Sequence, residues 1–533
     1  MRDTVRGMGQ AELLIAGLLV AVAGLSALAR WLSVPYPIVL VIGGALFGFV
    51  PGLPEVTLDP EVVLVIFLPP LLYGAAFFAN LGDLRENLRG ITLSSVGLVL
   101  ATMGAVAVVA HELVAGLPWA AAFALGAVVS PTDPLAGATI MRRLGVPRRL
   151  VSAVEGEGLF NDATALVAYR VAVVTVVSGG FSLGEAALRF LAGGLGGVAV
   201  GLAVGWIVAA IRARTRDAQV SITISLLSGY AAFVPADLVG ASGVLAAVTT
   251  GIYMGIRGPS IIPARTRLQG FFVWDILDFL LNATLFVLVG LQLHGVLDGL
   301  GGRPVGTLAG YALAVSAVVV VGRLVWFFTM PYLIRALDRR PSQRDRRVGA
   351  GPRLVVAWSG MRGAVSLAAA LALPLQTDAG LPFPERDLIV FLTFAVIFST
   401  LVVQGLSLPA LIRRLRIGDG GTDETEELRA RLEAAKAALS QIDALAEEGW
   451  TREDSIERMR RAYEYRERRF AARAGKIEDD GYEDRSLAYQ QMVQGVLAAQ
   501  REALVRLRND GAISNEVMNR MVLEVDLEES RLV

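Results

Sequence analysis

The stretch AAAFALGAVVSPTDPLAGATI, residues 120–140, is the clearest clue to how this chain folds. It is apolar and long enough to cross a membrane as a helix, which takes about 20 residues. Its middle, however, holds Thr132 and Asp133 between Pro131 and Pro134. Proline removes a backbone donor and disfavours helix in the residue before it. We therefore expect a helix broken at mid-depth, which survives only where it is buried in protein or lines a wet cavity.

The composition extends this reading to most of the chain. Of the 533 residues, 54% are hydrophobic and only 18% are charged, whereas soluble domains are about a quarter charged. Apolar runs of about 17–25 residues predict an all-α polytopic membrane protein with about thirteen transmembrane helices. These predicted spans cover residues 10–30, 34–50, 60–79, 90–112, 117–140, 148–178, 184–211, 218–236, 240–256, 269–293, 304–332, 351–373 and 386–412.

The arginines between the spans predict the orientation of the chain. Clusters occupy alternate loops, and the intervening loops at 179–183 and 294–303 are nearly free of positive charge. Loops rich in Lys and Arg face the cytoplasm. With about thirteen spans, this rule places the N-terminus outside and the C-terminus in the cytoplasm. The arginine-rich loops are 141–149, 212–217, 257–268 and 333–350.

A second region follows Ile417, where the composition changes abruptly. The sequence GDGGTDETEE, residues 418–427, is typical of a linker that leads into a helix. Apolar residues then recur at steps of three and four, which predicts amphipathic helices. We expect a transmembrane domain at 1–417 and a cytoplasmic helical domain at 418–533, which serves either stability and dimerisation or regulation.

Several classes of function are not supported by the sequence. There is no cysteine and there are only two histidines, which argues against disulfides and against sites built on thiolate or imidazole ligands. The net charge is zero, so no nucleic-acid partner is indicated. No nucleotide-binding loop or nucleophilic triad supports a membrane enzyme, and we expect no cofactor.

Ionisable residues within the spans are the candidates for function, because each is costly in the hydrocarbon region. We expect solvation or interfacial partners for Asp237, Asp275 and Asp278, which lie near the ends of predicted spans, and a buried ion pair between helices for Arg170. The candidates in central positions are Asp133, Glu155, Glu157, Asp162, Arg323 and Arg362.

The twelfth predicted span contains a second weak point, SGMRG at 359–363. It lies seven spans after the first interruption. If spans one to six repeat as eight to thirteen, the two broken spans are matching members of two inverted repeats. Paired interrupted helices of this kind indicate the midplane site of a transporter.

The sixth predicted span carries polar residues beside the first break. Glu157 and Asn161 are four residues apart and share a helix face, and Asp162 adjoins them near mid-depth. A carboxylate beside free backbone carbonyls offers hard oxygen ligands, which suit Na⁺, Li⁺, K⁺ or a proton. Mg²⁺ or Ca²⁺ would usually need more carboxylates. The alternative is that these acids are paired only for helix packing.

Five motifs together carry a family resemblance. They resemble the sodium/proton exchangers of the monovalent cation:proton antiporter superfamily, and in particular the bacterial NhaP-like antiporters, over about residues 10–415. The resemblance implies discontinuous crossing helices, a homodimer, elevator-type alternating access and a role in pH homeostasis at the cell membrane. The motifs are IFLPPLLYGAAF (66–77), SPTDP (130–134), EGEGLFND (155–162), LNATLFVLVGLQL (281–293) and SGMRGAVSLA (359–368).

The resemblance also implies roles for single residues. Asp162 would bind the ion and the proton, and Thr132 would help it to coordinate Na⁺. Glu157 and Asn161 would support this site. Asp133 would balance the exposed amide end of a half-helix.

The resemblance also implies roles for two arginines, and the chain departs from the family pattern at two positions. Arg362 would balance the carbonyl end of the other broken helix or pair with a buried acid, and Arg323 would pair with a carboxylate such as Glu157. Gly158 stands where the family often has a serine that supplies a ligand oxygen. Asn282 stands where animal exchangers often have an acidic residue.

The mechanism that follows is a one-for-one exchange. Moving an empty, negative site through a low-dielectric barrier is costly, whereas a single carboxylate neutralised by Na⁺ or by H⁺ can cross. The neutral Asn161 beside Asp162 therefore favours electroneutral Na⁺/H⁺ antiport. A K⁺/H⁺ antiporter is the nearest alternative. A cation channel with a regulatory tail and a membrane scaffold are two further classes.

Overall fold

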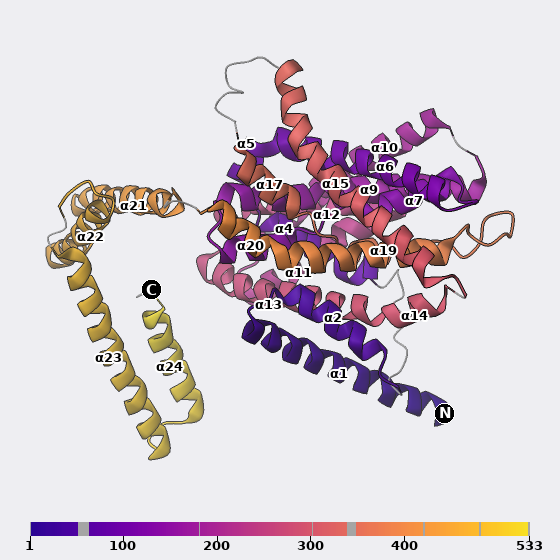
Figure 1. Cartoon of the computed structure of the whole chain (residues 1–533). Helices are drawn as coiled ribbons and strands as arrows, with labels where there is room; N and C mark the ends of the chain where they lie inside the picture. Colours follow the sequence, from indigo (N-terminus) through magenta and orange to yellow (C-terminus); the bar gives the residue numbers. More distant parts are fainter. Residues whose placement is uncertain are drawn as a thin grey trace. The chain divides into compact units, whose positions relative to one another are not determined.

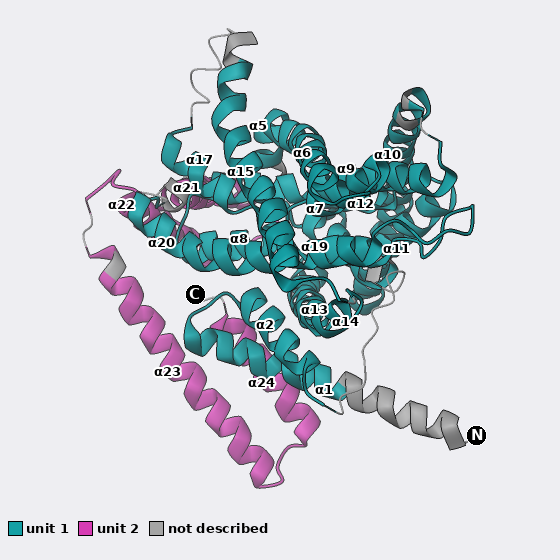
Figure 2. Ribbon diagram, turned by 45° about the vertical axis from the view of Figure 1, so that its right-hand side comes forward, with its two compact units in different colours: residues 1–418 teal, residues 419–533 magenta. Residues whose placement is uncertain are grey.

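The computed structural model of the chain describes residues 2–51, 63–180, 182–300, 302–337, 348–418, 422–478 and 481–530 (Figure 1). The start of the third predicted span, most of the arginine-rich loop at 333–350 and the beginning of the linker lie outside these ranges. Within them the chain is helical or irregular apart from one isolated bridge between Gln376 and Pro382. The chain divides into two compact units, Met1–Gly418 and Asp419–Val533, which Figure 2 colours separately.

The first unit is a bundle of helices in which most predicted spans are recognisable. The sixth predicted span, for example, coincides with α9 at Arg148–Ser178. The helices are α1 (Arg2–Leu32), α2 (Tyr36–Gly48), α4 (Leu68–Phe77), α5 (Leu81–Thr92), α6 (Val99–Leu113), α7 (Trp119–Val129), α8 (Pro134–Arg143), α9, α10 (Leu183–Arg214), α11 (Ala218–Leu238), α12 (Gly243–Ile261), α13 (Ala264–Leu291), α14 (Leu293–Asp298), α15 (Val305–Leu337), α17 (Ala350–Trp358), α18 (Ala364–Leu371), α19 (Arg386–Ser399) and α20 (Gly405–Leu415).

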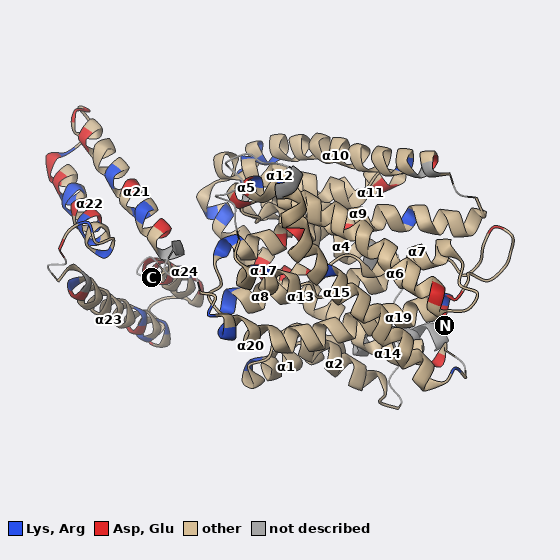
Figure 3. Cartoon of the chain, turned by 45° about the horizontal axis from the view of Figure 1, so that its top comes forward, with Lys and Arg blue, Asp and Glu red and all other residues tan. Residues whose placement is uncertain are grey.

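Seven of the helical segments in the described residues are long and apolar enough to cross a membrane on their own. Shorter apolar helices accompany them, and these include α2 and the segment Val65–Phe77. Figure 3 shows that most Lys and Arg of this unit gather towards one end of the bundle, while its middle carries only a few charged side chains, both acidic and basic. The prediction of an all-α polytopic membrane protein is confirmed.

Three π-helical turns interrupt the helices within the described ranges, and the sequence did not predict them. They are η1 (Val63–Phe67), η2 (Leu93–Leu98) and η3 (Thr400–Gln404). A π turn frees local backbone groups from the regular ladder and is often found at functional sites. Two of the three, η2 and η3, contact the candidate site described below.

The position of α13 is set by a close approach to α2. A Cβ atom at Gly290 would collide with the backbone of Val41 and Ala45, and one at Gly44 would collide with the backbone of Val287. Both contacts therefore require glycine, and α2 is the principal neighbour of α13. Helix α13 in turn forms a wall of the cavity that contains the candidate site.

The part of the second unit that the structure describes contains four helices, α21 (Thr422–Ala446), α22 (Glu453–Arg473), α23 (Tyr482–Asn509) and α24 (Asn515–Glu529). The stripe of apolar residues expected on α21 is buried, with Leu432 only 1% exposed, and α21 packs chiefly against α22. Arg501 of α23 joins α24 through Asp526 at 2.5 Å and Glu529 at 2.7 Å. The tail is thus helical, as expected from its periodicity.

Candidate functional site

The first break in the membrane unit lies between α7 and α8. Helix α7 ends at Val129 and α8 begins at Pro134, and Ser130 to Asp133 link them without regular structure. Asp133 is the N-cap of α8, because its Oδ1 accepts the N–H of Leu135 at 2.8 Å. A carboxylate at this position stabilises the positive end of a helix.

The second break lies between α17 and α18 and packs against the first. The N–H of Asp133 donates to the carbonyl of Met361 at 2.8 Å, which joins the two irregular segments directly. Gly363 is required at the crossing, because a Cβ atom there would collide with the Asp133 carboxylate. The discontinuous crossing helices expected from the sequence are therefore present, and they meet backbone to backbone.

Arg362 fills the space behind this crossing and is 1% exposed. Its Nε donates to the carbonyl of Val129 at 3.0 Å, and its other nitrogens contact the carbonyls of Gly360 and Ser130. These groups include the unpaired carbonyl end of α7, where a positive charge is stabilising. Of the two expected roles of Arg362, the structure shows contact with the carbonyl end rather than an ion pair with an acid.

Arg323, on α15, holds the corresponding end of α17. Its Nε donates to the carbonyl of Ala357 at 3.0 Å, and Nη2 donates to that of Val356 at 3.2 Å. Its Nη1 forms an ion pair with Glu157, and both side chains are almost fully buried. Arg323 thus links the second break to α9, with the carboxylate partner expected from the sequence.

Glu157 continues into a short network that reaches the first break. Thr132 donates through Oγ1 to the Glu157 carboxylate at 3.2 Å. Asn161 donates through Nδ2 to Thr132 Oγ1 at 2.7 Å and to the Thr132 carbonyl at 3.1 Å. The Oδ1 atom of Asn161 is buried and has no hydrogen-bond partner in the described residues. An amide oxygen left unpaired in this way could accept from water or coordinate a cation.

Asp162 is outside this network and lines a cavity of about 390 Å³. Its carboxylate forms no hydrogen bond or ion pair with any residue that the structure describes. Thr132, Asp133 and Pro134 of the first break line the same cavity, as does Gly363 of the second. The candidate residues are therefore brought together. Asp162 faces the cavity, whereas Glu157 and Asn161 are buried in the protein beside it.

Glu155 lies farther out along the same cavity. It forms an ion pair with Arg142, whose side chain is 62% exposed. Both residues line the cavity, which therefore extends from Asp162 to the surface beside the loop at 141–149. The two acids Glu155 and Glu157 have different partners, although they are separated by one residue.

Gly158 has a steric role in addition to lacking a side-chain oxygen. A Cβ atom at this position would lie 2.5 Å from Cγ of Pro134, far inside normal contact. Helix α9 therefore approaches the start of α8 closely, and any side chain at 158 would push the two apart. In this chain, the ligands at this level of the cavity have to come from other residues.

The expectations for Asp278 and Arg170 need correction. Asp275 is exposed, as expected, although it lines the same cavity as Asp162 and Asp278. Asp278 lies in the middle of α13, which begins at Ala264. Arg170 does form an ion pair between helices, with Asp237, but the pair is exposed rather than buried, at 51% and 44%.

Sequence reasoning also missed two hydroxyl residues that support the site. Ser95 of η2 donates to the backbone carbonyl of Glu157 at 3.1 Å. Thr400 of η3 accepts the backbone N–H of Arg362 at 3.2 Å. Both side chains are buried and lie in apolar runs of the sequence. Apart from the hydroxyl group itself, no sequence pattern marks either residue as part of a site.

Comparison with known proteins agrees with this architecture. The family model described as "Sodium/hydrogen exchanger, transmembrane" matches residues 17–414. An uncharacterized Na⁺/H⁺ exchanger of Mycobacterium tuberculosis is 38% identical and covers 98% of this chain and 97% of its own. A sodium, potassium, lithium and rubidium/H⁺ antiporter of Bacillus subtilis is 32% identical over 71% of this chain and 58% of its own.

A solved structure shows the same fold. The sodium proton antiporter MjNhaP1 of Methanocaldococcus jannaschii aligns with a TM-score of 0.56 and 19% identity, covering 76% of this chain and 99% of its own. The family match spans both broken helices and the cavity between them. The chain therefore belongs to the sodium/hydrogen exchanger family.

Proposed function

We propose that this chain exchanges Na⁺ for H⁺ across the cell membrane and that Asp162 binds the two ions in turn. The proposal depends on one observation above all. Asp162 is a carboxylate in the middle of α9 that lines a cavity beside the first break and has no protein partner among the described residues. A charge in such a place needs a cation or a proton to neutralise it.

The residues around Asp162 fit roles in ion binding. Thr132 lines the cavity and would help Asp162 to coordinate Na⁺ through an oxygen of the broken segment. Asn161 would orient Thr132 and could offer its unpaired Oδ1, directly or through water. Glu157 is engaged with Arg323 and would keep the network in place. Asp133 would fix the start of α8 at the edge of the site.

The stoichiometry proposed is one Na⁺ for one H⁺. Asn161, which adjoins Asp162, is neutral, and the nearby Glu157 is balanced by Arg323. Binding of either ion to Asp162 would therefore leave the same net charge in the moving part of the site. Since a charged site crosses a low-dielectric barrier less readily than a neutral one, the loaded forms would cross and the transport would be electroneutral.

Alternating access by an elevator movement is part of the same proposal, as are the topology and the homodimer. The arginines at one end of the bundle (Figure 3) support a cytoplasmic location for that end, with the N-terminus outside and residues 418–533 in the cytoplasm. The cavity reaches the surface beside Arg142, on the arginine-rich side. It would therefore give access to Asp162 from the cytoplasm.

K⁺/H⁺ exchange is the second candidate, and the Bacillus subtilis relative favours it by its name, which includes potassium, lithium and rubidium. Na⁺, Li⁺ and K⁺ share a preference for oxygen ligands and differ in the cavity size that suits them.

The test is transport by the purified protein in proteoliposomes that carry an imposed pH gradient. Addition of Na⁺, Li⁺ or K⁺ should dissipate the gradient at a rate that saturates with cation concentration and does not change when a membrane potential is imposed with valinomycin. The Asp162→Asn variant should insert normally and lose this activity. Retention of exchange by Asp162→Asn would reject the assignment of the binding residue, and single-channel currents would reject the carrier mechanism.

A further inference from the structure

Asp278 occupies the same level of the bundle as Asp162. It lies fourteen residues after the first residue of α13, and Asp162 lies fourteen residues after the first residue of α9. At about 1.5 Å per residue, each carboxylate is about 21 Å from the start of its helix. Both helices begin next to arginine-rich loops, at 141–149 and at 257–268. The two carboxylates are therefore at similar depth from the same side.

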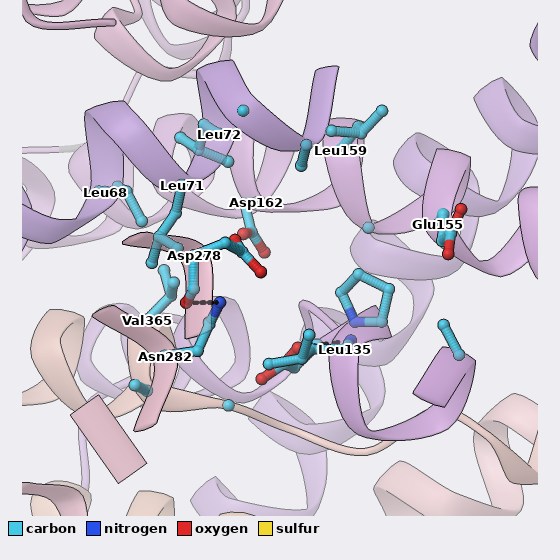
Figure 4. Close-up of a pocket in the computed structure, with 18 of the residues that line it drawn as sticks. Leu68, Leu71, Leu72, Leu135, Glu155, Leu159, Asp162, Asp278, Asn282 and Val365 are labelled. Atoms are coloured by element: carbon cyan, nitrogen blue, oxygen red, sulfur yellow. Dashed lines mark hydrogen bonds between the residues drawn. The ribbon is translucent and has the colours of Figure 1, made fainter. Parts of the chain in front are cut away.

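The two carboxylates also face one space. Asp162 and Asp278 both line the cavity of about 390 Å³, and Figure 4 shows both side chains directed into it. Asp278 is half-buried, and the neighbouring Asn282, whose amide donates to the backbone carbonyl of Asp278 at 2.9 Å, carries no charge that could neutralise it. No ion pair of Asp278 is found among the described residues.

Acidic residues predominate in the cavity lining. Five acidic residues line it, and its only basic lining residue within the described part of the chain, Arg142, forms an ion pair with Glu155. A cleft of one sign with apolar walls concentrates ions of the opposite sign. Four carboxylates remain in the cavity without an ion-pair partner in that part of the chain, namely Asp133, Asp162, Asp275 and Asp278.

We propose that Asp278 is a second cation-binding carboxylate, which draws a monovalent cation into the cavity and passes it to Asp162. This inference rests on the proposed exchange function and adds to it a residue on the opposite wall. Asp133 cannot take this role as readily, because one of its oxygens is held by the N-terminus of α8. Asp275 is exposed, one turn nearer to the start of α13, which leaves Asp278 as the carboxylate opposite Asp162.

The packing of α9 and α13 indicates that Asp278 assists cation binding from one side of the membrane only. Helix α9 packs chiefly against α7, α8 and α5, whereas α13 packs chiefly against α2, and no extensive contact joins α9 to α13 in the residues that the structure describes. If the group that carries Asp162 moves relative to the wall that carries Asp278, the two carboxylates share a cavity only in states open to the arginine-rich side. Asp278 then increases the apparent cation affinity on that side alone.

The test compares transport in membrane vesicles of the two orientations, with Na⁺ as the probe. In everted vesicles, which present the cytoplasmic side, Asp278→Asn should raise the apparent KM for Na⁺ by about three- to tenfold, with a maximal rate close to that of the unaltered chain. In right-side-out vesicles, the KM should change less than twofold. Asp278→Glu, which keeps the charge, should restore most of the affinity.

Two comparisons separate this inference from simpler explanations. Asp298→Asn removes an equal charge from an exposed position on α14 and should leave the KM unchanged. An unchanged KM for Asp278→Asn in everted vesicles would overturn the inference, and so would an equal increase on both sides or equal loss of transport in the Asn and Glu variants. Failure of the unaltered chain to exchange Na⁺ for H⁺ would instead overturn the proposed function.

Discussion

Replacement of Arg323 by methionine should destabilise the fold strongly, because this arginine joins three elements inside the bundle. Its side chain is 1% exposed, and that of its partner Glu157 is 5% exposed. Leaving one charge of such a pair buried alone costs about 3–5 kcal/mol. The carbonyl of Ala357 also loses its donor, at about 1 kcal/mol, whereas that of Val356 keeps the hydroxyl of Ser359. The expected total for Arg323→Met is roughly 5 kcal/mol.

A double-mutant cycle shows whether this loss comes from the ion pair. Glu157→Gln keeps an oxygen that can accept from Thr132 but leaves Arg323 charged and unpaired, at about 3–5 kcal/mol. The variant with both changes has no isolated charge, so its loss should fall short of the sum of the single losses by about 2–3 kcal/mol. Arg170→Gln is the matched control, and it lies on α9, the helix that also carries Glu157. The ion pair of Arg170 with Asp237 is half exposed and is worth about 1 kcal/mol at most.

The measurement is the unfolding temperature of the purified variants in one detergent at one heating rate. At about 2 °C per kcal/mol, the lower end for larger domains, Arg323→Met should unfold roughly 10 °C earlier than the unaltered chain, and Arg170→Gln about 2 °C earlier or less. Equal shifts for these two variants would refute the reasoning from burial. Strict additivity in the cycle would show that Arg323 and Glu157 do not depend on each other.

Three further changes test the remaining contacts. Arg362→Gln removes the charge from the carbonyl end of α7, so exchange in proteoliposomes should fall at least about tenfold, and near-normal rates would contradict that role. Gly158→Ser should not create a better site but should lower the unfolding temperature through its clash with Pro134, at about 1–3 kcal/mol; Gly158→Ala should behave alike if the effect is steric. Thr132→Val keeps the shape but removes the oxygen between Asn161 and Glu157, so the apparent KM for Na⁺ should rise about three- to tenfold, whereas an unchanged KM would exclude Thr132 as a ligand.

The parts of the site that the sequence predicted are those with local causes. Pro131 and Pro134 break the first helix whatever surrounds them, and the three polar positions of α9 follow from helical spacing. The hydrogen bond from Asp133 to Met361 joins residues more than 200 positions apart, and no local pattern could specify it. The same is true of the π turns, whose sequences VLVIF, LSSVGL and TLVVQ share no pattern that marks a π turn.

The misplacement of Asp278 has a different cause. Hydropathy locates the apolar part of a helix, and α13 begins at Ala264 with a polar first turn that contributes nothing to that signal. An acid near the end of the apolar run is then in the middle of the helix. Position along the apolar run and position along the helix therefore differ, and Asp278 is central only by the second measure.

The distribution of arginines leaves Asp162 without an ion-pair partner in the part of the chain that the structure describes. Both broken helices end in carbonyl groups inside the bundle, and each end is held by one buried arginine, Arg362 for α7 and Arg323 for α17. Arg323 is further balanced by Glu157. Because these two guanidinium groups are directed towards carbonyls and Glu157, neither neutralises Asp162, which faces the cavity on the other side of the crossing. A carboxylate paired with neither arginine is open to a mobile cation, as the proposed exchange requires, whereas a direct ion pair with either arginine would occupy it.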